Sequence, residues 1–263
     1  MSTSSKFDDL AVRLSSAAVM AVVGLGAIWL GGIWFLALIC LVVGLMVWEA
    51  ARLTAPDDTS GAQVLGAMAA VAVLIASQVP YSFTLAVLFI AGLYGIVRFE
   101  RGKAIFFAYC SMICLAGFAL FDLRDNHGAL WMLWLALVVI ATDVFGYFGG
   151  RLIGGPKFWP RVSPKKTWSG TVAGWVAAAI VGALFAAFTN AGFGLVIVSM
   201  LISFASQMGD IAESAIKRRA GVKDSSALIP GHGGLLDRFD GMLGASVALL
   251  MLQLIIDSPV PAL

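Results

Sequence analysis

The chain has 263 residues, of which 60% are hydrophobic and only 12% are charged. Soluble domains carry about 25% charged residues, so this composition excludes a soluble globular protein. The formal net charge of +2 also argues against a nucleic-acid-binding protein, which needs a strongly basic surface. No charged residue occurs in stretches 14–48, 59–97 and 171–208. Apolar runs of this length predict an integral membrane protein of the helical kind.

We predict an all-α fold with about nine transmembrane helices. The three longest apolar runs exceed one bilayer crossing, and each contains a turn signal: Gly31-Gly32, Pro80 and Asn190-Ala191-Gly192. In chain order, the helices are expected at 14–30, 33–48, 63–79, 82–97, 104–121, 129–150, 171–189, 192–208 and 241–257. We interpret 1–263 as a single membrane-embedded domain, with helices 1–5 in 1–128 and the remaining helices in 129–263.

Basic residues fall on one side of this topology. Nine crossings divide the connections between two faces of the membrane, and every Lys and Arg except Arg124 lies on the same face. Because cytoplasmic connections are enriched in Lys and Arg, we expect a cytoplasmic N-terminus and a C-terminus on the opposite side. The expected location is the bacterial plasma membrane.

Two of the cytoplasmic connections, 151–170 and 209–240, are too long and too polar to be simple turns. The second begins with a polar stripe at the spacing of one helical face, made by Asp210, Glu213, Ser214 and Lys217. Such a helix presents carboxylate, hydroxyl and ammonium groups to a cavity. The alternative is an ordinary solvated helix at the membrane surface, with its Lys and Arg side chains extending into water.

The second connection continues with three glycines around a histidine, followed by Asp237, Arg238 and Asp240. Glycines let a backbone approach an anion and present N–H groups to it. Carboxylates are the ligands that Mg²⁺ prefers, and they are supplied by Asp210, Asp237 and Asp240. Cations for phosphate binding are supplied by Lys217, Arg218, Lys223 and Arg238. Together these residues are typical of phosphoryl or nucleotidyl transfer.

The first connection carries Ser163, Lys165, Lys166 and Thr167 immediately before a predicted helix. Lysines beside a helix N-terminus favour anion binding, although a basic loop that contacts anionic lipids explains them equally well. Asp143 lies inside the sixth predicted helix. Ionisable groups at membrane depth are costly and usually functional, so we expect a role for Asp143 in the site; the alternative is a polar contact between helices.

The segment from Ser214 to Asp240 resembles the signature of phosphatidate cytidylyltransferases, also called CDP-diacylglycerol synthases. The matching residues are Ser-Ala-Ile-Lys-Arg at 214–218, Lys-Asp-Ser-Ser at 223–226 and Ile-Pro-Gly-His-Gly-Gly-Leu-Leu-Asp-Arg-Phe-Asp at 229–240. Asp143 with Tyr147, Gly150 and Arg151, and the residues 163–170, are similar to the other cytoplasmic motifs of that family. The chain departs from the family at Ser169, where Glu is more common, and at Phe145, where Gly or Ala is usual. The second departure is expected to change the cavity volume beside Asp143.

The resemblance implies transfer of a cytidylyl group from CTP to phosphatidic acid, which gives CDP-diacylglycerol and pyrophosphate with Mg²⁺ and a second cation present. It implies Asp210 and Asp237 as metal ligands, and we add Asp240 as a further ligand. The expected catalytic cations are Lys217, Arg218, Lys223 and Arg238. The expected substrate-binding residues are Asp143, Ser163, Lys165, Lys166, Thr167, Ser214, Asp224, His232, Gly233 and Gly234. The expected partners are the two substrates and membrane lipids, with a homodimer left open.

Two other functions stay open from the residues alone. A CTP-dependent polyprenol kinase also joins a cytidine triphosphate to a membrane lipid, but it releases CDP in place of pyrophosphate. A secondary transporter would use Asp143 as its coupling carboxylate and would have substrate sites near the midplane and internal repeats.

Overall fold

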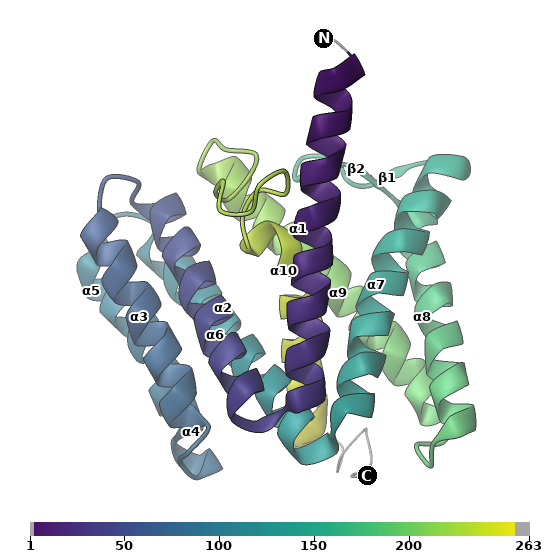
Figure 1. Ribbon diagram of the computed structural model, residues 1–263, viewed down its shortest axis with the longest axis horizontal. Helices are drawn as coiled ribbons and strands as arrows, with labels where there is room; N and C mark the ends of the chain where they lie inside the picture. Colours follow the sequence, from purple (N-terminus) through teal and green to yellow (C-terminus); the bar gives the residue numbers. More distant parts are fainter. Residues whose placement is uncertain (1–2, 256–263) are drawn as a thin grey trace. The chain divides into compact units, whose positions relative to one another are not determined.

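The structure, a computed structural model, describes the backbone of residues 3–255 and the side chains from residue 12 onward in that range. The described chain is helical apart from one short hairpin (Figure 1). The helices are α1 (Thr3–Leu30), α2 (Gly32–Thr54), α3 (Thr59–Ala76), α4 (Tyr81–Leu88), α5 (Ile90–Arg98), α6 (Lys103–His127), α7 (Ala129–Leu152), α8 (Trp168–Phe188), α9 (Gly194–Arg219) and α10 (Leu236–Ile255). The strands are β1 (Lys157–Trp159) and β2 (Ser163–Thr167).

Nine stretches in the described part of the chain are long and apolar enough to cross a membrane, which confirms the predicted number. The fourth stretch, Tyr81–Arg98, contains both α4 and α5. Large apolar side chains on these helices are exposed, among them Leu152 at 80% and Phe188 at 85%. Lipid solvates such faces, and a helix satisfies its own backbone hydrogen bonds there. The protein is therefore an integral membrane protein with many helical spans.

Most helices extend beyond at least one of their predicted ends. α1 begins at Thr3 and not at 14, and α6 continues to His127 and not to 121. α2 continues to Thr54, α9 continues to Arg219, and α10 begins at Leu236. The predicted ends were placed where charged residues begin, but a helix continues past that point when its polar side chains find partners in the protein. Asp237 therefore lies in the first turn of a helix and not in a loop. Residues 256 and 257, the predicted end of the ninth helix, lie outside the described residues.

The chain divides into two compact units, which we describe separately. The first comprises Met1–Cys114 and Ala220–Phe239, and the second comprises Leu115–Arg219 and Asp240–Leu263. The boundaries fall inside α6 and near the start of α10. The expectation of a single domain divided near residue 128 stays a prediction.

In the first unit, α2 and α3 pack backbone against backbone. A Cβ atom added at Gly66 would lie 2.6 Å from the carbonyl oxygen of Gly44. Asp58 begins α3 by accepting a hydrogen bond from the Gly61 amide, and it also pairs with Arg98 at the end of α5, 2.8 Å away. Hydrogen bonding from Arg98 lowers the pKa of Asp58 to about 2. The pair thus stays charged at neutral pH and joins the connections that follow α2 and α5.

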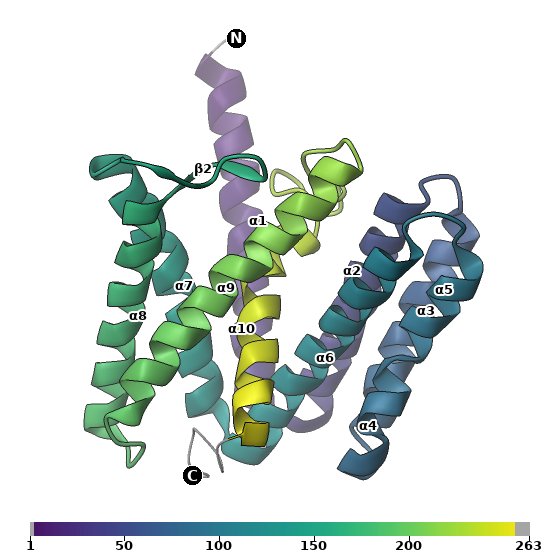
Figure 2. The ribbon, with the colours of Figure 1, turned by 180° about the vertical axis from the view of Figure 1, so that it is seen from behind.

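In the second unit, α8 packs against both α7 and α9 (Figure 2). A Cβ atom added at Gly170 would lie 2.5 Å from the carbonyl oxygen of Gly146, so α7 and α8 touch through their backbones. Between α7 and α9, Thr142 Oγ1 donates to Ser203 Oγ over 2.7 Å. Small residues and interhelical hydrogen bonds of this kind hold helices together in lipid, where apolar burial contributes little.

The connection between α7 and α8 forms a hairpin that the sequence did not predict. β1 and β2 pair antiparallel, with Lys157 opposite Thr167 and Trp159 opposite Ser163. The Thr167 hydroxyl then accepts a hydrogen bond from the Gly170 amide over 3.2 Å and caps the N-terminus of α8. The hairpin therefore places the strand that carries Lys165 and Lys166 beside a helix N-terminus.

The close contact between α7 and α8 predicts that Gly170→Ala destabilises the protein. The added methyl group must push the two backbones apart, a cost of about 1–3 kcal/mol by analogy with overpacked cores. The check is the thermal unfolding temperature of the purified protein in detergent. Gly24→Ala in α1 is the matched control, because its Cβ atom would meet nothing within 4 Å. Equal unfolding temperatures for the two variants would contradict the packing described here.

Candidate functional site

A cavity of about 530 Å³ lies within the second unit, between α7, β2, α8 and α9. Its wall combines acidic, basic and hydroxyl side chains with several glycines. The lining residues are Thr142, Asp143, Gly146, Tyr147, Gly150, Arg151, Lys165, Lys166, Thr167, Gly170, Thr171, Gln207 and Asp210. Five of the residues predicted for the site, Asp143, Lys165, Lys166, Thr167 and Asp210, thus meet in one cavity.

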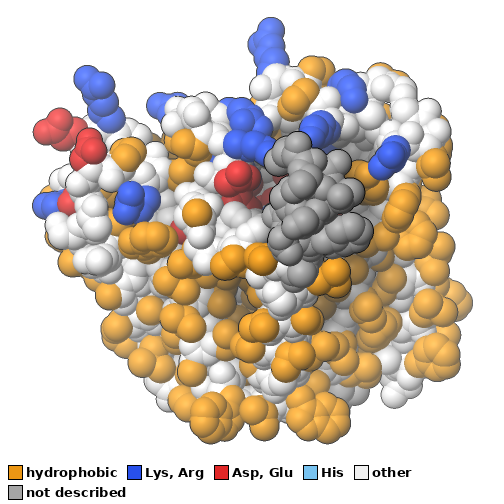
Figure 3. Space-filling model, turned by 45° about the horizontal axis from the view of Figure 1, so that its top comes forward, with side chains coloured by type: hydrophobic (Ala, Val, Ile, Leu, Met, Phe, Trp, Pro, Cys, Tyr) orange, Lys and Arg blue, Asp and Glu red, His pale blue; other side chains and the backbone are white. Residues whose placement is uncertain are grey.

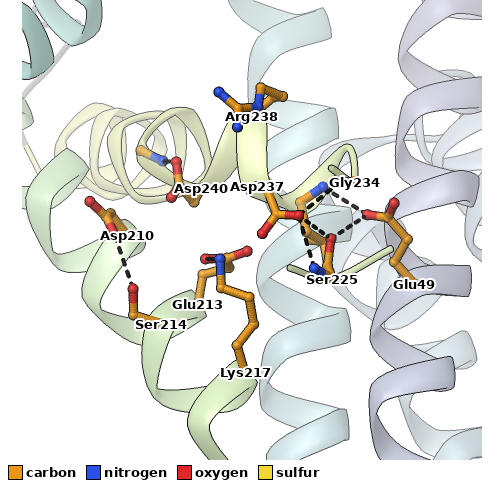
Figure 4. Close-up of polar contacts among 12 residues, drawn as sticks. Glu49, Asp210, Glu213, Ser214, Lys217, Ser225, Gly234, Asp237, Arg238 and Asp240 are labelled. Atoms are coloured by element: carbon orange, nitrogen blue, oxygen red, sulfur yellow. Dashed lines mark hydrogen bonds and ion pairs between the residues drawn. The ribbon is translucent and has the colours of Figure 1, made fainter. Parts of the chain in front are cut away.

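An ion pair links the two motifs of this cavity. The Lys166 ammonium lies 2.6 Å from Asp210 Oδ2 and also donates to the carbonyl oxygen of Gln207 over 3.2 Å. Ser214 donates to Asp210 Oδ1 over 3.2 Å (Figure 4). The side chains of Lys166 and Asp210 are 24% and 32% exposed. Asp210 therefore has a cation beside it while remaining open to the cavity.

Two further carboxylates lie near this ion pair. Asp143, exposed on the α7 side, is close enough to Asp210 and Lys166 for their charges to interact. Asp240, at the start of α10, interacts in the same way with Asp210 and Asp143. The second unit thus gathers three carboxyl groups around one lysine, and such a region favours the binding of further cations.

Gln207 is a cavity residue that sequence reasoning missed. Its side chain accepts a hydrogen bond from Trp175 Nε1 over 3.1 Å and donates to the carbonyl oxygen of Thr171 over 3.2 Å. It therefore joins α9 to α8 at the wall of the cavity. The available signal was its position three residues before Asp210, at the spacing of one helical face.

Ser169 and Phe145, the two departures from the family pattern, lie in different surroundings. Ser169 donates to the carbonyl oxygen of Gly154, so it braces the connection that carries the hairpin. Phe145 is 56% exposed and does not line the cavity. The expectation that Phe145 changes the volume beside Asp143 is therefore wrong.

In the first unit, residues 220–239 form a compact loop that leads into α10. Ile229 and Gly233 exchange backbone hydrogen bonds, with Ile229 N donating over 2.7 Å, and this closes a tight turn. Gly231 and Gly233 have φ angles of 75° and 85°, in the left-handed region that favours glycine. These two glycines are therefore needed for the turn itself.

Asp237 follows this turn and is held by three donors on one oxygen. Asp237 Oδ2 accepts from the Gly234 amide over 2.8 Å, and from the amide and the hydroxyl of Ser225 over 2.9 Å each (Figure 4). The negative charge also lies at the N-terminus of α10, where the helix dipole favours it. The orientation of this carboxylate is thus fixed by its own loop.

The other predicted residues divide between the two units. In the second, Lys217 pairs with the buried Glu213 one turn earlier on α9, Arg218 lies exposed at the end of that helix, and Ser163 begins β2. In the first, Arg238 donates to the carbonyl oxygen of His232 over 3.0 Å. Lys223 and Asp224 lie exposed in the same loop.

The metal site stays a prediction. Asp210 and Asp237 belong to different units, so their binding to one ion is not tested by the geometry of either unit. Among the side chains described, from residue 12 to residue 255, no group of three or more His, Cys, Asp or Glu lies close enough to hold a metal ion. Mg²⁺ is commonly bound by one or two carboxylates, with water and substrate phosphates as its other ligands.

Charged side chains gather at helix ends, while apolar side chains cover most of the face in view in Figure 3. The charged groups include both lysines of β2, and the apolar groups cover the sides of the helices. This separation is what a membrane boundary requires, because charges are costly in hydrocarbon.

The cytidylyltransferase family model matches residues 11–255, which is nearly the whole chain. The chain belongs to the cytidylyltransferase family. A phosphatidate cytidylyltransferase of Brucella abortus biovar 1 is 34% identical over 259 residues, which cover 95% of this chain and 96% of the relative. The Helicobacter pylori enzyme of the same name is 42% identical over half of each chain, and that of Haemophilus influenzae is 41% identical over 45% of this chain and 44% of its own. Family membership confirms the resemblance seen in residues 214–240.

The ion pair in the cavity predicts that substitution of Lys166 lowers stability more than substitution of the adjacent Lys165 does. Lys166→Met leaves Asp210 without its cation, so we expect a loss of about 1 kcal/mol in the free energy of unfolding, a value typical of partly exposed pairs. Lys165→Met is the matched control, because Lys165 lines the same cavity and is more exposed. A double-mutant cycle with Asp210→Asn measures the coupling. Zero coupling energy would contradict the pair.

Proposed function

We propose that this chain is a phosphatidate cytidylyltransferase, which transfers a cytidylyl group from CTP to phosphatidic acid and releases pyrophosphate. The observation that carries the proposal is the match over 95% of the chain to a relative of that name. The cavity supports it independently, because lysines, a threonine and the N-terminus of α8 lie beside carboxylates in its wall. These are groups suited to a nucleotide that meets a lipid phosphate.

In this reaction, a phosphate oxygen of phosphatidic acid attacks the α-phosphorus of CTP. The bond from that phosphorus to the bridging oxygen of the β-phosphate breaks, and pyrophosphate leaves. The nucleophile is already anionic, so no base is needed to activate it. The protein must hold two strongly negative groups together in line, which requires positioning and positive charge.

The basic residues of both units supply part of that charge. Lys165 and Lys166 project from β2 at the cavity, and the capped N-terminus of α8 adds its partial positive charge beside them. We assign triphosphate binding to Lys217, Arg218, Lys223 and Arg238. We assign supporting contacts with substrate to Asp143, Ser163, Thr167, Ser214, Asp224, His232, Gly233 and Gly234.

We also propose that Asp210 and Asp237 bind Mg²⁺, with Asp240 as a further ligand and a second cation nearby. The donor set fits this ion, since each residue offers carboxylate oxygen and Asp210 already has the Lys166 ammonium as its counter-charge. When bound, Mg²⁺ supplies charge stabilisation for the phosphate oxygens. Asp237 is prepared for this role by the three donors that fix its Oδ2.

The membrane arrangement completes the proposal. We propose a cytoplasmic N-terminus in a bacterial plasma membrane, with the cavity on the side that CTP reaches and the acyl chains remaining in lipid. The nearly one-sided distribution of Lys and Arg supports this orientation. A homodimer remains part of the proposal.

The metal assignment predicts that Asp210→Asn and Asp237→Asn each abolish Mg²⁺-dependent synthesis of CDP-diacylglycerol. We expect turnover to fall by roughly two to three orders of magnitude, because the developing phosphate charge loses its stabilisation. The assay is turnover of the purified, folded variants over a range of Mg²⁺ concentrations. Asp57→Asn, in the exposed connection after α2, is the control. Near-normal turnover by either variant would remove that residue from the metal site.

The function is tested with CTP labelled at either the α- or the γ-phosphate. We expect the α-label to enter the lipid product and the γ-label to leave as pyrophosphate, only when both phosphatidic acid and Mg²⁺ are present. Transfer of the γ-label to lipid with release of CDP would instead indicate a polyprenol-type kinase. No transfer of either label would overturn the proposal.

A further inference from the structure

Glu49 is a buried carboxylate that the reaction described above does not use. It lies on α2 in the first unit and is 0% exposed. Four donors point to it: the Ser225 hydroxyl at 3.3 Å, the Ser226 hydroxyl at 2.6 Å, and the backbone amides of Leu235 at 3.0 Å and Leu236 at 2.8 Å. All four belong to the signature segment, and a set made only of donors is what an ionised carboxylate accepts.

These donors come from both ends of one loop. Ser225 and Ser226 precede the turn at Pro230-Gly231, whereas Leu235 and Leu236 follow it and begin α10. The two amides belong to the first turn of that helix, where they have no partner within the helix. Glu49 therefore closes the loop and caps α10 from a helix nearly two hundred residues earlier in the chain.

Ser225 connects Glu49 to Asp237. Its hydroxyl lies 3.3 Å from Glu49 Oε2 and 2.9 Å from Asp237 Oδ2, between the two carboxylates (Figure 4). Its backbone amide also donates to Asp237 over 2.9 Å. A shift of residue 225 thus moves two of the three donors that orient Asp237. Glu49 itself is fully buried, and the four hydrogen bonds described above all come from the loop and the start of α10.

We propose that Glu49 is a positioning residue, which holds residues 225–236 so that Asp237 is oriented for cation binding. This inference rests on the proposed function of Asp237 as a metal ligand. Glu49 acts through Ser225 and the start of α10, and it does not touch the substrate. This positioning role explains why α2, a helix long and apolar enough to cross a membrane, carries the buried Glu49 near its C-terminal end.

Glu49→Gln is the most informative substitution, because it preserves shape. Each Glu49 oxygen accepts one backbone amide and one hydroxyl: Oε1 from Leu235 and Ser226, and Oε2 from Leu236 and Ser225. In either orientation the glutamine NH₂ group therefore faces a backbone N–H, which cannot turn away as a hydroxyl can. Glutamine must disturb the start of α10 whichever way it is placed.

The first readout is hydrogen exchange of the purified full-length protein in detergent. In Glu49→Gln, we expect backbone amides of residues 225–236 to exchange at least tenfold faster, with other spans unchanged. The control is Glu100→Gln, which replaces an exposed glutamate in the connection after α5. This measurement needs no substrate, so it tests the positioning even if the proposed function fails. Unchanged exchange in residues 225–236 would overturn the proposal.

The second readout is the affinity for Mn²⁺ in the presence of CTP. It is measured through the electron paramagnetic resonance signal of the ion. We expect Glu49→Gln to weaken Mn²⁺ binding at least tenfold and to raise the Mg²⁺ concentration for half-maximal turnover by a similar factor. The KM for phosphatidic acid should change less than twofold. A purely structural role would lower stability without this shift in metal dependence, and that result would overturn the proposal.

A second variant covers the case in which Glu49→Gln does not fold. Ser225→Ala removes the hydroxyl between the carboxylates and keeps the backbone amide that donates to Asp237. We expect a three- to tenfold loss of Mn²⁺ affinity in folded protein. Ser226→Ala removes a donor to Glu49 that does not contact Asp237, so a smaller loss is expected. Wild-type affinity in Ser225→Ala would contradict the link from Glu49 to Asp237.

Discussion

The structure depends on one constraint: each acidic side chain near the end of an apolar helix needs a cation or hydrogen-bond donors beside it. Lipid cannot solvate a carboxylate, so each one must find its partners in the protein. Asp210 has the Lys166 ammonium, whereas Glu49 and Asp237 have the amides and hydroxyls around the start of α10. These interactions fix the hairpin in the second unit and the signature loop in the first.

The two units contribute different parts of the proposed chemistry. The second unit supplies a cavity with Lys165, Lys166 and the N-terminus of α8, which suits the phosphates of a nucleotide. The first unit supplies Asp237 on a loop that is fixed by its own glycine turn and by Glu49. The proposed reaction needs positive charge, because phosphate groups repel one another until a cation is placed between them.

The nine spans could be predicted from sequence because hydrophobicity alone determines which segments enter a bilayer. The ends of α2, α9 and α10 could not be predicted in this way. A helix continues past a charged residue when that residue finds a partner far away in the sequence, as Glu49 of α2 does in the donors of residues 225–236. The hairpin at 157–167 was missed because its strands are short and polar. The cavity motifs were visible as clustered charges, whereas Gln207 and Glu49 act through partners that the local sequence does not reveal.

We propose, as the assignment on which the mechanism depends, that Asp210 and Asp237 are ligands of a divalent cation. Titration of Mn²⁺ into purified protein with CTP present, followed by electron paramagnetic resonance, tests this most directly. The account predicts tight binding by the wild-type protein and by Asp57→Asn, and at least tenfold weaker binding by both Asp210→Asn and Asp237→Asn. Wild-type Mn²⁺ affinity in either of the last two variants would contradict it.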